Sequence, residues 1–385
     1  MNSIDLLKKL VSFNSVFPNE SELAHFLADE LKKLGFKVEM QKFHDNRYNV
    51  LAQRGSKGKP VLLYGHIDTV PAYGYDLVNR DPFKIEEKDG KLYALGAYDM
   101  KSGIAAILKA VEEVKNEIGE RALKVMFVSD EEADSTGTYY VTKTDFFKDV
   151  DFAIATEISD IHDMNEKTRT ISLGRRGRVQ YEIKVPGKSF HAARMEHGIS
   201  AVTEAAKLSI ELEKMNSELP KHPKLSHGNQ YVRRFFSESV SLSIPDEATL
   251  LVDRHLVVPE NAESARKHIE DRINQLYAGG MMQEANSKRA TIRVKPREVP
   301  YLMPYATPED NKHVKQLSAV IDKTLGAKTQ YNYGLSVADE NLIAMQGIPV
   351  ISYGPIGEGE HSNGEWVSKK SYLELIDVLK AFLVA

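Results

Sequence analysis

Short apolar runs alternate with amphipathic segments through the first third of the chain. Residues 61–64 form a continuous apolar run, and residues 124–128 and 152–155 are two further strand candidates. Residues 23–34 and 104–118 instead repeat apolar positions at helical spacing. A strand that is apolar at every position is typical of a sheet buried on both faces. The alternation therefore predicts an α/β domain in which helices surround a mixed, largely parallel sheet.

Local capping signals place the ends of the first of these helices. Residues 19–22 have the pattern of a capping box at its start, and Gly35 is a candidate for its C-terminal cap. We therefore expect a helix that begins shortly after residue 19 and ends before Gly35.

The pattern changes near residues 174–178. Residues 179–185 alternate apolar and polar side chains, as in a strand with one solvated face. The segments that follow predict a β-α-β-β-α-β order, which is typical of a small ferredoxin-like α+β domain. They are a helix around 201–215, strands around 239–244 and 249–257, a helix around 264–277 and a strand at 290–294.

The α/β pattern then resumes, with a helix over 308–325, a strand at 349–353 and a closing helix from residue 371. The sequence thus predicts a catalytic domain, residues 1–174 and 298–385, interrupted by a lid or dimerisation domain, residues 175–297.

Composition excludes several classes of protein. A chain of 385 residues exceeds one ordinary domain, and its net charge of −4 argues against a general nucleic-acid binder. No apolar run approaches the roughly 20 residues of a membrane helix, and the N-terminus lacks the order of a signal peptide. We expect a cytoplasmic protein that binds neither nucleic acid nor membranes. Because cysteine is absent, any zinc must be held by His, Asp and Glu.

Histidines and carboxylates occur at the ends of the predicted strands or in short acidic turns. In an open α/β sheet, residues at the carboxyl ends of the strands converge on one edge. A mixed nitrogen and oxygen ligand set suits Zn²⁺, and the surplus of carboxylates favours two ions that share a bridging carboxylate. The candidate residues are His66, Asp68, Asp99, Glu131, Glu132, Glu157 and His361.

Each of these residues has an ordinary structural interpretation when taken alone. A single histidine is more often a core or surface residue than a ligand, and paired glutamates are common at solvated helix ends. Their joint occurrence after successive strands is what indicates a metal centre that activates water. Asp68 is placed to hold the second ring nitrogen of His66, and Glu131 and Glu132 can divide metal binding and proton acceptance between them.

At these residues the chain resembles the M20 family of metallopeptidases and amidohydrolases. The matching stretches are residues 65–71, 96–103, 130–132 and 361–367, in order along nearly the whole chain. The resemblance implies two zinc ions, for which cobalt or manganese can substitute. It implies Asp99 as the bridging ligand, Asp68 as orienter and Glu131 as general base. The remaining ligands it implies are His66, Glu132, Glu157 and His361.

Two positions in the insert also match family motifs. Residues 186–192 resemble the family's histidine motif, which implies that His191 stabilises the oxyanion, across the interface in dimeric members. Residues 252–254 resemble the motif whose arginine binds the substrate carboxylate, which implies that role for Arg254. The outer strand edge and helices of the insert also suit a homodimer. Residues 160–170 look longer and more polar than usual, and residues 334–340 match the family's substrate loop only loosely.

The sequence predicts a di-zinc hydrolase that cleaves the amide bond of a small N-acyl amino acid, of the deacetylase or desuccinylase type. A dipeptidase or carboxypeptidase with the same chemistry is the alternative, because both substrate classes present a free carboxylate. A remoter alternative is a metal-binding protein that uses the cleft only for recognition.

Overall fold

The computed structural model describes residues 1–74, 81–158, 168–239 and 241–385. The chain divides into two compact units. Unit 1 contains Met1–Gly174, Ala306–Gly334 and Ala338–Ala385, and unit 2 contains Arg175–Tyr305 and Leu335–Val337. The structure places the two main boundaries at 174/175 and 305/306, whereas the sequence predicted 174/175 and 297/298. The boundary falls later in the chain because Arg178 N–H donates a hydrogen bond to the Leu302 carbonyl, which joins the segment after residue 297 to unit 2.

A nine-stranded mixed sheet forms the centre of unit 1. Its main path runs β1-β2-β6-β3-β7-β17-β8-β15, and β16 pairs with β8. Among the described residues, parallel pairs join β6, β3, β7 and β17, whereas β1-β2, β2-β6 and β17-β8 are antiparallel. The predicted mixed, largely parallel sheet is confirmed, with its parallel part in the middle. The strands are β1 (Lys37–His44), β2 (Arg47–Arg54), β3 (Lys57–His66), β6 (Arg121–Val128), β7 (Phe152–Ala155), β8 (Thr168–Arg175), β15 (Tyr305–Ala306), β16 (Lys328–Gly334) and β17 (Val350–Ser352).

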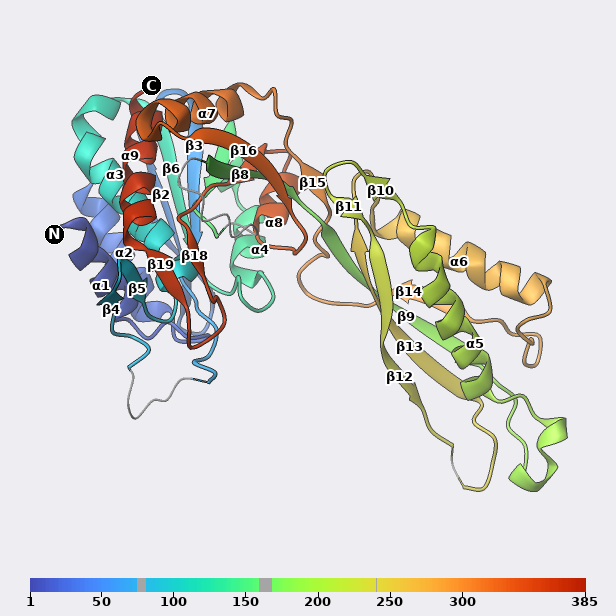
Figure 1. Cartoon of the computed structure of the whole chain (residues 1–385). Helices are drawn as coiled ribbons and strands as arrows, with labels where there is room; N and C mark the ends of the chain where they lie inside the picture. The colour runs from blue at the N-terminus through green and yellow to red at the C-terminus, as the bar shows by residue number, and fades with distance from the viewer. Residues whose placement is uncertain (75–80, 159–167, 240) are drawn as a thin grey trace. The chain divides into compact units, whose positions relative to one another are not determined.

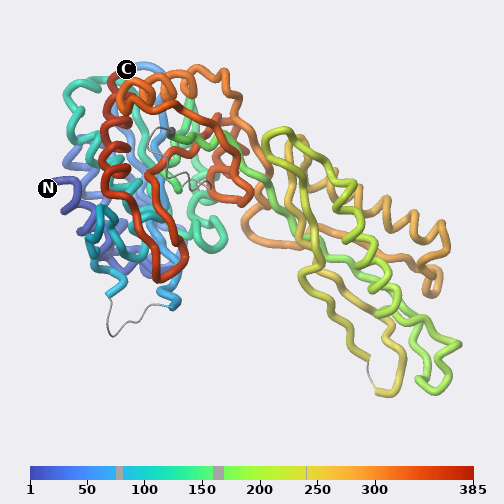
Figure 2. Tube along the Cα trace, viewed as in Figure 1, coloured from blue at the N-terminus to red at the C-terminus, as the bar shows by residue number. Residues whose placement is uncertain are grey.

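Helices lie on both sides of this sheet, and both chain termini belong to unit 1 (Figures 1 and 2). On one side α3 packs against α9 and α9 against α7, while α4 and α8 contact each other on the other side. Apolar side chains of α1, α2, α3, α7 and α9 pack with those of the strands and form one large core. The helices are α1 (Ser3–Val11), α2 (Ser21–Lys33), α3 (Ser102–Ile118), α4 (Thr136–Thr142), α7 (Lys312–Leu325), α8 (Glu340–Met345) and α9 (Lys369–Val384).

A small antiparallel sheet in unit 1 brings together segments that are distant in the sequence. Its order is β18-β19-β5-β4, and Trp366 of β19 pairs with Tyr93 of β5. The strands are β4 (Glu86–Lys88), β5 (Lys91–Tyr93), β18 (Gly357–Glu358) and β19 (Trp366–Ser368). This pairing holds the chain before residue 99 beside the hairpin that contains residue 361.

Unit 2 has its own antiparallel sheet and its own core. The strand order β12-β13-β9-β14 and the chain order β-α-β-β-α-β are those of a ferredoxin-like fold, as predicted. Helices α5 and α6 cover one face of this sheet (Figure 1). The elements are β9 (Gly177–Pro186), α5 (Ala201–Lys214), β12 (Asn229–Ser237), β13 (Glu247–Leu256), α6 (Ala262–Ala278) and β14 (Thr291–Val294), with a short hairpin of β10 (Lys221–His222) and β11 (Ser226–His227).

Two local predictions are wrong. The second strand of the insert is β12, Asn229–Ser237, and not residues 239–244, because the bulged pairing with β13 recruits the preceding polar and aromatic segment. The predicted capping box at residues 19–22 does not form, because Glu20 at the start of α2 makes no side-chain cap. Its buried carboxylate instead accepts hydrogen bonds from Arg47. Gly35 does end the helix, with a φ of 82°.

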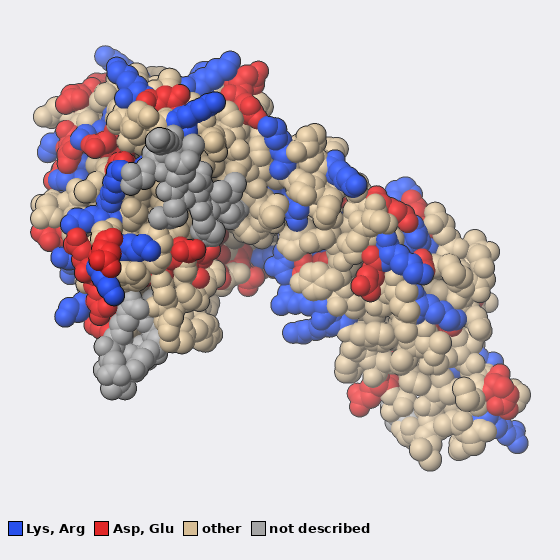
Figure 3. Space-filling model, viewed as in Figure 1, with Lys and Arg blue, Asp and Glu red and all other residues tan. Residues whose placement is uncertain are grey.

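Of the helices in the described ranges, none combines the length and apolar composition needed to cross a bilayer. Acidic and basic side chains are interspersed over the visible face of unit 1 (Figure 3). Of the polar segment 160–170, residues 160–167 lie outside the described residues.

Candidate metal centre

Four of the candidate residues follow the ends of adjacent parallel strands. His66 is the last residue of β3, Glu131 and Glu132 follow β6, and Glu157 follows β7. Because β6, β3 and β7 are neighbours and run parallel, their carboxyl ends meet at one edge of the sheet. This edge is where the strand pattern predicted that the side chains would converge.

Asp99 and His361 reach the same edge through the small sheet. Asp99 lies in the irregular turn Ala97–Lys101 between β5 and α3, with φ and ψ of −106° and 94°. The Asp99–Met100 peptide is cis. His361 lies in the loop between β18 and β19, with a φ of 60°. Pairing of β19 with β5 therefore holds both side chains in place.

The two carboxylate oxygens of Asp99 face different histidines. Oδ1 lies 3.0 Å from Nε2 of His66, and Oδ2 lies 3.3 Å from Nε2 of His361. Glu157 Oε2 lies 3.7 Å from Nε2 of His66, and Glu132 Oε2 lies 3.0 Å from Nε2 of His361. The structure thus holds two groups, each with one histidine and one glutamate, joined by Asp99. His66, Asp99 and Glu132 also have ligand atoms within 4.8 Å of one another.

This cluster concentrates negative charge in a buried place. Burial first, and the nearby Asp99 carboxylate second, raise the pKa of Glu157 to about 8. Burial is also the largest cause that raises the pKa of Glu131 well above its ordinary value, although His66 opposes it. Carboxylates crowded in this way are stabilised by cations close to them.

The residues fit divalent metal ions. Glu157 Oε2 is buried and has no hydrogen-bond partner among the described residues, although it points toward the Nε2 atom of His66. A buried polar atom without a partner is uncommon and often marks the place of an ion. A carboxylate and an imidazole nitrogen that face each other at 3.7 Å are suited to share one metal ion between them.

Asp68 supports the centre in a different way from the one predicted. The Nδ1 atom of His66 lies 3.0 Å from the Asp68 backbone carbonyl and 3.6 Å from its carboxylate. That carboxylate instead accepts hydrogen bonds from the backbone N–H groups of Glu131, at 3.2 Å, and Glu132, at 3.0 Å. The main chain of Asp68 therefore orients the histidine, and its side chain fixes the loop that carries both glutamates.

Sequence reasoning missed two buried carboxylates, Asp339 and Glu365. Asp339 is fully buried, and its Oδ2 accepts hydrogen bonds from the hydroxyls of Tyr64, at 3.0 Å, and Thr138, at 2.5 Å. It lies in the stretch 334–340 that matched its family counterpart only loosely. Glu365 was also missed, although it lies inside the quoted stretch 361–367. Nothing in the local pattern distinguishes a buried carboxylate from a solvated one.

The remaining two candidates belong to unit 2. His191 is exposed, and its Nδ1 accepts a hydrogen bond of 3.1 Å from the Ala193 backbone. With Nδ1 as acceptor, the neutral ring carries its proton on Nε2, which makes Nε2 a donor.

Arg254 is buried in unit 2. Its side chain is fully buried within unit 2 and forms a 2.5 Å ion pair with Glu260. It also donates to the Gln230 side chain at 3.3 Å. The guanidinium is thus enclosed and already paired with an acid in this structure, and its role in binding a substrate carboxylate stays a prediction.

Replacing Arg254 with methionine should destabilise the protein by about 3–5 kcal/mol, because Glu260 is left buried without its partner. Chemical denaturation followed by circular dichroism measures this loss. The double variant Arg254→Met, Glu260→Gln should recover most of it and retain the KM of the unmodified enzyme. A stable double variant with a strongly raised KM would instead support a direct role of Arg254 in substrate binding.

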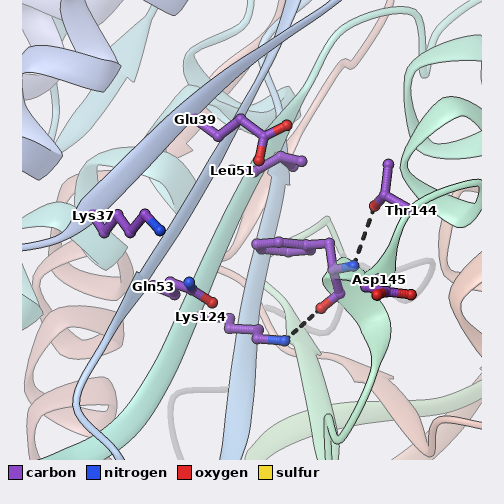
Figure 4. Close-up of a pocket in the computed structure, with 8 residues that line it drawn as sticks. Lys37, Glu39, Leu51, Gln53, Lys124, Thr144 and Asp145 are labelled. Carbon is purple, nitrogen blue, oxygen red and sulfur yellow. Dashed lines mark hydrogen bonds between the residues drawn. The ribbon is translucent and has the colours of Figure 1, made fainter.

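A separate hollow of about 230 Å³ lies on the outer strands β1, β2 and β6 (Figure 4). Lys124 spans part of it and donates a 2.6 Å hydrogen bond to the Phe146 carbonyl. None of the predicted ligands lines it. The lining residues are Lys37, Glu39, Leu51, Gln53, Lys124, Thr144, Asp145 and Phe146.

Comparisons with known proteins agree with this fold. The sequence pattern of peptidase family M20/M25/M40 matches residues 62–385. Succinyl-diaminopimelate desuccinylase of Rickettsia bellii is 25% identical over 98% of this chain and 95% of its own. Aminopeptidase PepT of Bacillus cereus has the same fold, with a TM-score of 0.78 and 18% identity over 99% of this chain and 97% of its own.

A second solved structure is the YXEP protein of Bacillus subtilis, described as a dinuclear metal binding peptidase. It has a TM-score of 0.72 and 16% identity over 99% of this chain and 96% of its own. These findings define a metallohydrolase that acts on amide or peptide bonds. The chain belongs to peptidase family M20/M25/M40, and the resemblance inferred from its sequence is confirmed.

Proposed function

We propose that this protein is a di-zinc hydrolase that cleaves the amide bond of a small N-acyl amino acid. The observation that carries the proposal is the position of Asp99, whose two oxygens face His66 and His361 separately. One carboxylate between two histidine–glutamate pairs is suited to bridge two metal ions. The description of the Bacillus subtilis relative as dinuclear supports the same number.

We assign the ligands from this geometry. His66 and Glu157 would hold one ion, His361 and Glu132 would hold the other, and Asp99 would serve both. Zinc accepts this mixture of imidazole nitrogen and carboxylate oxygen, and cobalt or manganese can replace it.

In the proposed reaction, bound metal supplies Lewis acidity and lowers the pKa of water towards about 7. Glu131 accepts the proton of the attacking water and returns it to the leaving amine. The Asp68 carboxylate accepts a hydrogen bond from the Glu131 backbone N–H and so helps to hold Glu131 in place. The donor Nε2 of His191 stabilises the oxyanion that forms on the scissile carbonyl.

The relatives' name favours an N-acyl amino acid as the substrate class. The Rickettsia bellii relative matches 98% of this chain and is named a desuccinylase, but its identity of 25% leaves room for a different acyl group or for a short peptide. A metal-dependent dipeptidase or carboxypeptidase is therefore the second candidate.

A panel of acetyl-amino acids, succinyl-amino acids and dipeptides tests the substrate class. We expect the highest kcat/KM on an acyl-amino acid, with zinc present. A preference for dipeptides would replace the proposed acyl substrate with the peptidase alternative, while hydrolysis of none of them would contradict the substrate class as a whole.

We further propose that the protein forms a homodimer through unit 2. Strand β12 ends the path of its sheet and bears exposed aromatic side chains, including Tyr231 and Phe236, which are 50% and 65% exposed. An edge strand of this kind is suited to pair with a second copy. In this dimer each chain supplies His191 to the metal centre of its partner.

Subunit mixing tests this arrangement. His191→Ala and Glu131→Gln homodimers should each be nearly inactive, whereas a refolded mixture should recover part of the activity in heterodimers with one intact site. His197→Ala, which alters a nearby exposed histidine, should remain active as the matched control. A mixture no more active than its parents would argue against a shared site.

A further inference from the structure

Glu365 is a buried carboxylate that binds the backbone of the turn carrying Asp99. It lies immediately before β19 and is 1% exposed. Its Oε1 accepts hydrogen bonds from the backbone N–H groups of Tyr98, at 2.9 Å, and Asp99, at 3.1 Å. Its Oε2 accepts one from Gly96, also at 2.9 Å. Three main-chain donors of one short turn thus converge on one side chain.

This turn lacks the regular helical structure in which carbonyl groups would accept hydrogen bonds from those N–H groups. Asp99 and Met100 both depart from helical φ and ψ, and Gly96 has a φ of 70°. A buried N–H group without an acceptor is costly, so such a turn needs acceptors from elsewhere in the fold. Glu365 supplies them, with one side-chain oxygen for two of the N–H groups and the other oxygen for the third.

The contact also joins the two sides of the metal centre. Glu365 and His361 belong to the same hairpin, between β18 and β19, while Gly96 and Asp99 belong to the segment after β5. The hydrogen bond to the Asp99 N–H holds the very residue whose carboxylate oxygens lie 3.0 and 3.3 Å from the two histidines. A shift of this turn would move both oxygens together.

We infer that Glu365 is a positioning residue that fixes the turn of Asp99, so that one carboxylate can serve two metal ions. The inference rests on the proposed di-metal function and adds a residue outside the ligand set. A glutamine at this position has the same shape but offers one oxygen in place of two. Its NH₂ group would then face a backbone N–H, and the turn would lose part of its support.

Metal titration without substrate tests the inference. The chelator-stripped enzyme and its Glu365→Gln variant are titrated with Zn²⁺ alone in a calorimeter. We expect the variant to bind zinc about 10- to 100-fold more weakly, as is typical when a group that orients a ligand is altered. At saturating zinc its kcat should remain lowered with little change in KM, because the substrate contacts are intact.

Two further variants make the result decisive. Glu117→Gln makes the same chemical change at an exposed position of α3 and should bind zinc like the unmodified enzyme. Glu365→Asp keeps both acceptor oxygens and should recover part of the affinity; it also replaces the glutamine variant in the titration if that variant fails to fold. The inference is overturned if Glu365→Gln, or Glu365→Asp used in its place, binds zinc with the affinity of the Glu117→Gln control. Failure of the unmodified enzyme to bind two ions would instead contradict the proposed function.

Discussion

Replacing Glu131 with glutamine is expected to lower kcat by about 10²–10⁴-fold while the metal content stays unchanged. Glutamine keeps the size of the side chain but cannot accept a proton from water. We assign the metal contacts to Glu132 and Glu157 rather than to Glu131, so the ions should remain bound. Steady-state kinetics with elemental analysis of the same sample measures both quantities.

The control for this substitution is Glu117→Gln, which removes one carboxylate from the exposed face of α3. It should leave both kcat and metal content unaltered. If Glu131→Gln keeps most of its activity, Glu131 is not the base. If it loses metal together with activity, Glu131 is a ligand and the division of labour between the two adjacent glutamates is reversed.

Removing the metal should abolish hydrolysis. Metal activation of water and of the carbonyl supplies several kcal/mol to the reaction, and each 1.4 kcal/mol is a factor of ten in rate. We therefore expect a loss of about 10³-fold or more after dialysis against a chelator. Adding zinc or cobalt should restore the activity.

A buffer-dialysed sample is the control, because it separates loss of metal from loss of folded protein. Circular dichroism before and after chelation should show the same secondary structure, since the cores of both units are formed by apolar side chains. Activity that survives complete chelation would exclude a metal-dependent reaction. If the stripped protein keeps its structure but neither zinc nor cobalt restores its activity, neither of them is the native metal.

The sequence was sufficient to predict which segments form the edge where the candidate metal ligands converge. His66, Glu132 and Glu157 each follow an apolar strand, and parallel strands in one sheet necessarily bring such residues together. The insert could be predicted as well, because its alternating strands and amphipathic helices have a different period from the rest of the chain.

What could not be predicted depends on contacts between distant residues. A sequence motif does not reveal that Arg254 pairs with Glu260, because an arginine has the same chemistry whether it faces a ligand or a buried acid. The Asp68 carboxylate was assigned to His66 from strand alternation, whereas the turn after β3 directs it to two backbone N–H groups. Residues 19–22 fitted a capping pattern, but the Glu20 carboxylate accepts hydrogen bonds from Arg47 of β2.

Counting zinc ions tests the central claim most directly. The stripped, unmodified enzyme is titrated with zinc while binding and hydrolysis are followed together. A centre in which Asp99 joins the His66 and His361 groups predicts two ions per chain at saturation. Saturation at one ion per chain, or no specific binding, would contradict it.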